Sequence, residues 1–332
     1  MSQELFTFKE LLGQEKAKSL LLRARQQGRL GHAYLFRGPA GVGKKRAATT
    51  FAATLNCRLG GPGDACGHCP SCLKIASGNH PDFLTVAADG SSIRIQQIRE
   101  LKKTLSYPPF EAAHRVVLLA DIQLMGREAA NSLLKTLEEP PAQTILVLTV
   151  EEADDTLATI RSRCQIVPFY PLAVGHITKI LQDKAPELTS EMAATAAALA
   201  EGSPGLALQL ARQEITAFRL ELISALADLP AEQPETIRAV LRLAEKAASF
   251  KEELPRLLSF LSLWLRDLLL FNLGQAAKIV NFDLVPLFER TTKKWSPQQI
   301  MSRLDNIAKA ERQLARNCNR GMVCEVLFFS LL

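Results

Sequence analysis

The stretch HAYLFRGPAGVGKKRAATTFAATLN, residues His32–Asn56, decides the fold. A short apolar run, 33–36, leads into a glycine-rich loop, and an alanine-rich run, 44–56, follows the loop. The loop Gly38–Lys45 matches the phosphate-binding pattern G-x-x-x-x-G-K-[ST] except at its last position. We therefore predict a strand, a phosphate-binding loop and a helix in that order, which is the context in which this pattern is meaningful.

Each residue type that this pattern requires has a physical task. Backbone N–H groups near Gly38, Gly41 and Gly43 turn toward phosphates, the helix N-terminus adds its dipole, and Lys44 neutralises charge. Where the pattern requires a hydroxyl that holds Mg²⁺, the sequence has Lys45, which cannot coordinate a cation. We therefore predict a degenerate nucleotide site, and the sequence leaves open whether ATP or ADP binds there.

The acidic residue of such a site is expected at the end of a neighbouring strand. The stretch VVLLADIQ places Asp121 after an apolar run, where it could hold Mg²⁺ through water. The next residue, where such ATPases have a glutamate that polarises the attacking water, is Ile122. Two catalytic groups are missing from two loops, which favours a site without hydrolysis; a degenerate but active site is the alternative.

Four cysteines, Cys57, Cys66, Cys69 and Cys72, crowd into the stretch NCRLGGPGDACGHCPSC. In a reducing cytosol such crowding favours metal binding over disulfides. Four thiolates complete the tetrahedral shell of Zn²⁺ with no open position, so we predict a structural zinc site. An iron–sulfur cluster is the alternative, because C-x2-C-x2-C also occurs in ferredoxins.

Strand and helix patterns alternate in the first half of the chain, which is typical of an α/β fold with a parallel sheet. We predict strands at 33–36, 83–86, 115–120 and 144–150, and helices at 44–56, 95–106 and 127–138. From Pro171 onward strand signals vanish, and amphipathic helical patterns such as 257–270 and 300–314 replace them. We expect an α/β domain at 1–168 with the zinc module at 57–72, a small helical domain at 169–212, and a larger one at 213–332.

Composition sets broad limits on the class of protein. The 332 residues are 47% hydrophobic and 22% charged, which is ordinary for a soluble protein of two or three domains. The longest apolar stretches are strand-sized and the N-terminus lacks a basic-then-apolar signal, so we expect a cytoplasmic protein without a membrane segment. The net charge of +6 permits contact with a polyanion and says little by itself.

Several stretches along the chain carry a family resemblance. They are GQEKAKSLLL from Gly13, HAYLFRGPAGVGKK, the four-cysteine insert, NSLLKTLEEPP at Asn131–Pro141, SRC at Ser162–Cys164, WLRDLLLF from Trp264 and RNCNRGMVCEVL from Arg316. Together they resemble the AAA+ clamp-loader subunits of bacterial DNA polymerase III over nearly the whole chain. The resemblance implies an AAA+ P-loop domain, a helical lid domain and an all-helical collar domain through which subunits oligomerise.

Two subunit types of this family share the layout. One is the hydrolysing gamma/tau motor, and the other is the delta-prime (delta') subunit, which keeps an arginine finger and usually has a defective nucleotide site. Three nucleotide-site positions of the family are occupied by residues that are wrong for a motor: Lys45, Ile122 and Gly205, the last where the lid arginine would lie. The arginine finger falls on Arg163 and is intact. The chain therefore resembles the delta' type, with the gamma/tau type as the alternative.

The resemblance implies a role in DNA replication, within a DNA-directed DNA polymerase holoenzyme. The implied subunit does not hydrolyse ATP itself and lends Arg163 in trans to a neighbour's ATP. Such fingers stabilise transition-state charge and are worth about 10³ to 10⁵ in rate. The implied partners are gamma/tau and delta subunits in a hetero-pentameric ring, with the sliding clamp and primer–template DNA reached through the complex.

Overall fold

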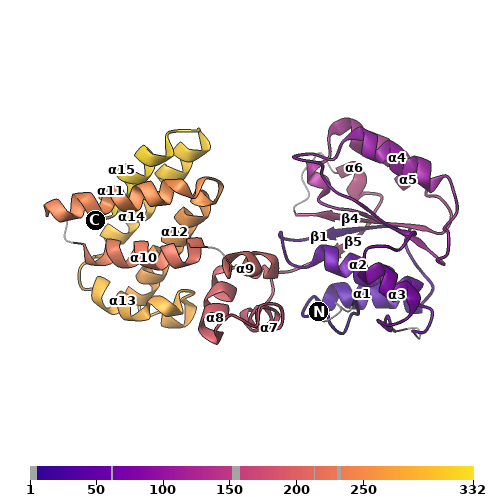
Figure 1. Ribbon diagram of the computed structural model, residues 1–332, viewed down its shortest axis with the longest axis horizontal. Helices are drawn as coiled ribbons and strands as arrows, with labels where there is room; N and C mark the ends of the chain where they lie inside the picture. Colours follow the sequence, from indigo (N-terminus) through magenta and orange to yellow (C-terminus); the bar gives the residue numbers. More distant parts are fainter. Residues whose placement is uncertain (1–5, 61–62, 152–157, 213, 230–232) are drawn as a thin grey trace. The chain divides into compact units, whose positions relative to one another are not determined.

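The structure is a computed structural model that describes residues 6–60, 63–151, 158–212, 214–229 and 233–332. The chain forms two compact units. The first runs to Ile177 and includes Gly202–Gly205, and the second contains Thr178–Glu201 and Leu206–Leu332. Figure 1 shows that the first unit combines a sheet with helices and that the second is built of helices. The predicted α/β fold followed by helices is confirmed, and the boundaries at 168 and 212 stay a prediction.

A five-stranded parallel sheet in the order β2-β3-β4-β1-β5 forms the centre of the first unit. Its strands are β1 (Ala33–Arg37), β2 (Phe83–Val86), β3 (Arg115–Leu119), β4 (Thr144–Val150) and β5 (Gln165–Pro168). Both β3 and β4 are buried along their whole length, which explains why they read as continuous apolar runs. In the register, Leu35 of β1 pairs with Leu148 on one side and Ile166 on the other. The glycine-rich loop therefore leaves the sheet between β4 and β5.

Helices cover both faces of this sheet (Figure 1). One layer holds α1 (Glu15–Gln26), α2 (Lys44–Asn56) and α3 (Pro70–Ala76), and the other holds α4 (Ile95–Leu105), α5 (Arg127–Glu138) and α6 (Ala158–Arg161). Side chains of β1 alternate between the layers: Tyr34 packs edge-on against Phe51 of α2 at 5.4 Å between ring centroids, whereas Leu35 joins the core under α4 and α5. The sheet thus fixes the positions of the loops at its carboxyl end.

Each strand and helix predicted in this unit is present, with ends within one residue of the predicted ones. The sequence predicts no strand at β5. This edge strand has four residues, Gln165 and Ile166 are exposed, and Pro168 ends it, so it lacks a continuous apolar run.

The second unit is all-helical over its described residues. Its helices are α7 (Val174–Lys184), which begins in the first unit, α8 (Ser190–Leu199), α9 (Pro204–Leu210), α10 (Glu214–Asp228), α11 (Pro234–Ser249), α12 (Leu254–Asn272), α13 (Val285–Thr291), α14 (Pro297–Ala315) and α15 (Arg320–Leu331). The fully buried Trp264 packs edge-on against Trp295, with ring centroids 5.7 Å apart. Nearby in the same unit, the buried Arg219 pairs with Asp283 at 2.7 Å. Among the described residues, every helix is too short or too polar to cross a bilayer.

Candidate functional site

The glycine-rich loop joins β1 to α2, and its glycines are required by the path of the backbone. A side chain at Gly38 would place its Cβ atom 2.4 Å from the carbonyl oxygen of Phe169. Gly41 and Gly43 have φ angles of +70° and +99°, which residues with side chains rarely adopt. The three glycines predicted from the sequence therefore shape the loop as a phosphate-binding loop requires.

Lys44 begins α2, and its ammonium group turns back onto its own loop. The residue is 5% exposed, and Nζ donates to the carbonyl oxygens of Gly38 at 2.5 Å and Pro39 at 2.8 Å. Burial lowers the pKa of Lys44, an effect that the carboxylates of Glu151 and Asp121 partly offset. Two of the three N–H donors of this ammonium are thus engaged by loop carbonyls.

Lys45 and Asp121 form a direct ion pair, with 2.6 Å between Nζ and Oδ2. Asp121 follows β3 in a left-handed conformation, and its N–H donates to Oγ1 of Thr149, near the end of β4, at 2.8 Å. In hydrolysing P-loop proteins, Mg²⁺ lies between the residue after the loop lysine and this acidic residue. Here Lys45 and Asp121 contact each other directly, so the positive charge beside Asp121 is the ammonium of Lys45.

Ile122 is fully buried at the start of the short 3-10 helix η1 (Ile122–Leu124) and belongs to the hydrophobic core under α4 and α5. The position expected for a water-activating carboxylate is therefore filled by core packing. Of the residues predicted for the nucleotide site, the structure brings together Lys44, Lys45 and Asp121 beside the loop glycines.

The turn Gly202–Gly205 lies against the loop within the first unit. The N–H of Gly205 donates to the carbonyl oxygen of Gly41 at 3.1 Å. A Cβ atom at Gly205 would lie only 3.0 Å from Cα of Gly41. The family resemblance implies a lid arginine at the position of Gly205. Here the backbones of Gly205 and Gly41 are in close contact at this position, which leaves little space for any side chain.

Arg163, the predicted arginine finger, follows α6 and has a side chain that is 35% exposed. Its Nε and Nη2 atoms donate to a single oxygen, Oε1 of Glu138, at 2.9 and 2.5 Å. Its Nη1 atom donates to the carbonyl oxygen of Thr159 at 3.0 Å and to Oγ of Ser162 at 3.2 Å. The guanidinium therefore lies at the surface of the first unit in an orientation fixed by its own chain.

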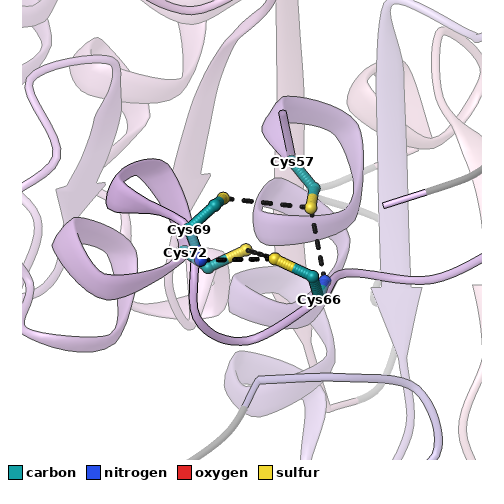
Figure 2. Close-up of side chains that lie close together, drawn as sticks. All are labelled: Cys57, Cys66, Cys69 and Cys72. Atoms are coloured by element: carbon teal, nitrogen blue, oxygen red, sulfur yellow. Dashed lines mark hydrogen bonds between the residues drawn. The ribbon is translucent and has the colours of Figure 1, made fainter. Parts of the chain in front are cut away.

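The four cysteines of the insert converge on one point, as Figure 2 shows. Cys57 follows α2, Cys66 and Cys69 precede α3, and Cys72 lies within α3. Their Sγ atoms all lie within 4.8 Å of one another, with 3.9 Å between Cys57 and Cys69 and 4.0 Å between Cys66 and Cys72. Four sulfurs at about 2.3 Å from one metal form a tetrahedron with edges of about 3.8 Å. The four cysteines could therefore bind one metal ion.

Backbone N–H groups face these sulfurs. The N–H of Cys66 donates to Sγ of Cys57 at 3.3 Å, and the N–H of Cys69 donates to Sγ of Cys66 at 3.3 Å. Burial opposes ionisation of Cys69, yet hydrogen bonds from neighbouring backbone N–H groups lower the pKa of its thiol to about 6. Burial raises the pKa of Cys72. The N–H groups compensate thiolate charge, as a metal–thiolate centre requires.

Comparison with known proteins gives one consistent answer. A family model described as "DNA polymerase III, delta subunit" matches residues 13–173, and one described as "DNA polymerase III, delta subunit, C terminal" matches residues 213–332. DNA polymerase III subunit delta' of Bacillus subtilis is 32% identical over 96% of each chain. The chain belongs to the delta' family of DNA polymerase III clamp-loader subunits.

Other relatives of this delta' family member are also subunits of DNA polymerase III. The delta' subunit of Escherichia coli is 31% identical over 89% of this chain and 86% of its own length. The tau subunit of Bacillus subtilis DNA polymerase III is 32% identical over 63% of this chain and 38% of its own length. The resemblance drawn from the sequence motifs is confirmed, and the observed parallel sheet agrees with the fold that it implies.

Two residues of this delta' family member have structural roles that the sequence does not predict for them. Asp64, within the cysteine insert, accepts the N–H of Phe8 at 2.9 Å and that of Lys9 at 3.1 Å. Glu138 holds Arg163 from the end of α5. Both contacts join residues that are far apart in the sequence, and neither has a local motif that could reveal it.

Proposed function

We propose that this chain is a non-hydrolysing delta' subunit of the DNA polymerase III clamp loader, which supplies Arg163 to the ATP of a neighbouring subunit. Its own loop, with Gly38, Gly41, Gly43, Lys44, Lys45 and Asp121, is in this proposal a degenerate nucleotide site. The observation that carries the proposal is the Lys45–Asp121 ion pair.

The ion pair opposes Mg²⁺ binding in two ways. A divalent ion at Asp121 would have to displace the ammonium of Lys45 and would then be repelled by it. Lys45 also lacks an oxygen that could replace one water ligand of Mg²⁺. The bridging metal thus lacks its usual hydroxyl ligand, and with Ile122 in the core the attacking water lacks its carboxylate.

Arg163 is suited to act outside its own chain. Its side chain is partly exposed, and its guanidinium is held by surface contacts with Glu138, Thr159 and Ser162 and is not enclosed by the core. A guanidinium presented to a neighbour's γ-phosphate would stabilise the charge that develops there. Assembly would then complete an active site that neither subunit has alone.

For the four-cysteine centre we propose a structural Zn²⁺ held by Cys57, Cys66, Cys69 and Cys72. The sulfur spacing supports a single tetrahedral ion. A polynuclear iron–sulfur cluster binds its thiolates to different iron atoms, which would separate the sulfurs further than these. The ion would stabilise an insert that has little core of its own.

The partners in this proposal are gamma/tau and delta subunits in a hetero-pentameric ring in the cytoplasm, with the sliding clamp and primer–template DNA reached through the complex. Exposed apolar side chains in the helical unit support subunit contact. Ile237 and Leu241 lie four residues apart on α11, and Met322, Val326 and Phe329 follow helical spacing on α15, with exposures between 41% and 66%. Apolar faces of this kind are typical of protein interaction surfaces.

Assays on the purified chain distinguish this proposal from the gamma/tau alternative. The similarity to a tau subunit is the observation that favours that alternative. We expect no ATP hydrolysis above background, and no increase in ATP affinity when Mg²⁺ is added in a calorimetric titration. Mg²⁺-dependent turnover that Lys44→Ala abolishes would contradict the proposal and support a motor of the gamma/tau type.

A further inference from the structure

Arg163 is unusually well supported for a partly exposed arginine. Oε1 of Glu138 accepts from its Nε and Nη2 atoms, and groups of its own segment, the Thr159 carbonyl and Ser162 Oγ, accept from Nη1. Because the guanidinium is planar, acceptors on two of its sides fix its position and its plane together. These contacts engage four of the five N–H groups and leave the second one on Nη2 for a phosphate oxygen.

The place of Glu138 in α5 points to a purpose other than helix stability. It is the last residue of this helix, where the macrodipole is negative and a carboxylate is unfavourable. The ion pair with Arg163 is the interaction that offsets this repulsion. The pair also joins α5 to the segment that follows α6, so it sets where the finger lies relative to the sheet.

We propose that Glu138 is the positioning residue of the arginine finger: it holds the Arg163 guanidinium in the orientation in which it meets the γ-phosphate of the neighbouring subunit's ATP. This inference rests on the proposed function. A lock that withholds Arg163 is the opposite possibility, but the side chains are 35% and 49% exposed, and the second N–H of Nη2 is left for a phosphate oxygen. The pair therefore restricts the rotamers of a long side chain and leaves the guanidinium accessible to ATP.

The test uses the reconstituted loader with ATP and primed DNA, and compares Glu138→Ala, Glu138→Gln and the matched control Glu139→Ala. We expect Glu138→Ala to lower the DNA-stimulated kcat by about two- to threefold, and by less than Arg163→Ala does, while KM for ATP changes by less than about twofold. Glu138→Gln should keep most of the activity, because its amide oxygen still accepts from the guanidinium. Glu139→Ala should behave as the unmodified loader, since no described contact joins its side chain to Arg163.

Size-exclusion chromatography confirms that each loader is assembled. If Glu138→Ala does not assemble, Glu138→Asp replaces it in the comparison. Glu138→Asp keeps a carboxylate that is one methylene too short, so we expect it to lower kcat by less than Glu138→Ala. An unchanged kcat for an assembled Glu138 variant, with Arg163→Ala still lowering kcat, would refute the inference and leave the proposed function in place. A rise in kcat would also refute it and identify a lock. If Arg163→Ala has no effect either, the proposed function fails together with the inference.

Discussion

Lys45 contacts Asp121 at 2.6 Å, and Lys44 donates to the carbonyl oxygens of Gly38 and Pro39. Both lysines of the loop are therefore engaged within the chain. In a hydrolysing protein with this loop, the lysine at the position of Lys44 would neutralise phosphate charge, and the position of Lys45 would carry a Mg²⁺ ligand. In our proposal a single change of residue type, hydroxyl to ammonium, thus replaces a metal-binding site by an internal ion pair.

Replacing Lys45 with threonine tests this account of the pair. The variant restores a hydroxyl ligand and frees Asp121, so we expect ATP to bind about tenfold more tightly with Mg²⁺ than without it. Hydrolysis should stay absent, because Ile122 provides no carboxylate. Titration calorimetry with and without Mg²⁺ measures both affinities. Lys45→Ala removes the ammonium without adding a ligand and should show a smaller gain than Lys45→Thr. Equal affinities for Lys45→Thr under both conditions would count against the account.

At this scale the sequence reveals which groups are missing, and only the structure reveals what replaces them. The departures at Lys45 and Ile122 are visible because a motif defines the expected residue. The ion pair with Asp121 and the support of Arg163 by Glu138 depend on the packing of separate strands and helices, for which no local pattern exists.

The helix α2 connects the two features of the first unit that carry chemistry. Its N-terminus forms part of the phosphate-binding loop, and Cys57 lies directly after its last residue. The insert that follows returns through Asp64 to the N–H groups of Phe8 and Lys9. A metal ion bound by the cysteines would therefore stabilise the N-terminal segment as well as the insert.

Removal of the metal tests this connection between elements. We expect the purified chain to be colourless and to contain about one zinc ion per chain. Chelation should raise amide hydrogen exchange at Phe8 and Lys9, because Asp64 loses its fixed position. Zinc should also be released as the pH falls, since the thiolates that bind it become protonated.

Mass spectrometry of the intact and exchanged protein makes these measurements. Asp64→Ala is the matched variant: it should raise exchange at the same two amides while zinc stays bound. Unchanged exchange at Phe8 and Lys9 after zinc is lost would show that the insert and the N-terminal segment are independent.

Elements with a strong local signal are predictable from this sequence. The buried strands β3 and β4 are mostly apolar, and α2 follows a motif that defines its first residue. The edge strand β5 has no such signal, because only Val167 of its residues is fully buried and its pairing with β1 determines its conformation. For the cysteine insert, spacing predicts the ligands, and their distances confirm that all four can meet at one point.

At the scale of the whole molecule, we propose that the two units have different tasks in a ring of subunits. The first unit carries the degenerate loop, the cysteine centre and Arg163, and the second presents apolar residues on α11 and α15. In our proposal the nucleotide site of this subunit is silent, so the subunit acts only within an assembly, where Arg163 serves a neighbour.

Assembly through the helical unit can be tested on α15. Val326 is 66% exposed, so Val326→Asp should leave the folded chain intact but block its entry into the loader. Leu273, just after α12 and 61% exposed, is the control: Leu273→Asp should assemble normally. Circular dichroism verifies folding and size-exclusion chromatography measures assembly. Normal incorporation of Val326→Asp would exclude this face of α15 from the interface.

The most direct measurement is the DNA-stimulated ATPase rate of a loader reconstituted with Arg163→Ala, beside one with Arg161→Ala. Arg161 lies two residues earlier, is exposed, and carries the same charge. Our account predicts that Arg163→Ala lowers kcat at least about threefold in a fully assembled ring, because a finger is worth about 10³ to 10⁵ at the one site that it serves. Arg161→Ala should leave the rate unchanged. Equal rates for the Arg163→Ala and unmodified loaders, with both rings intact, would contradict the account.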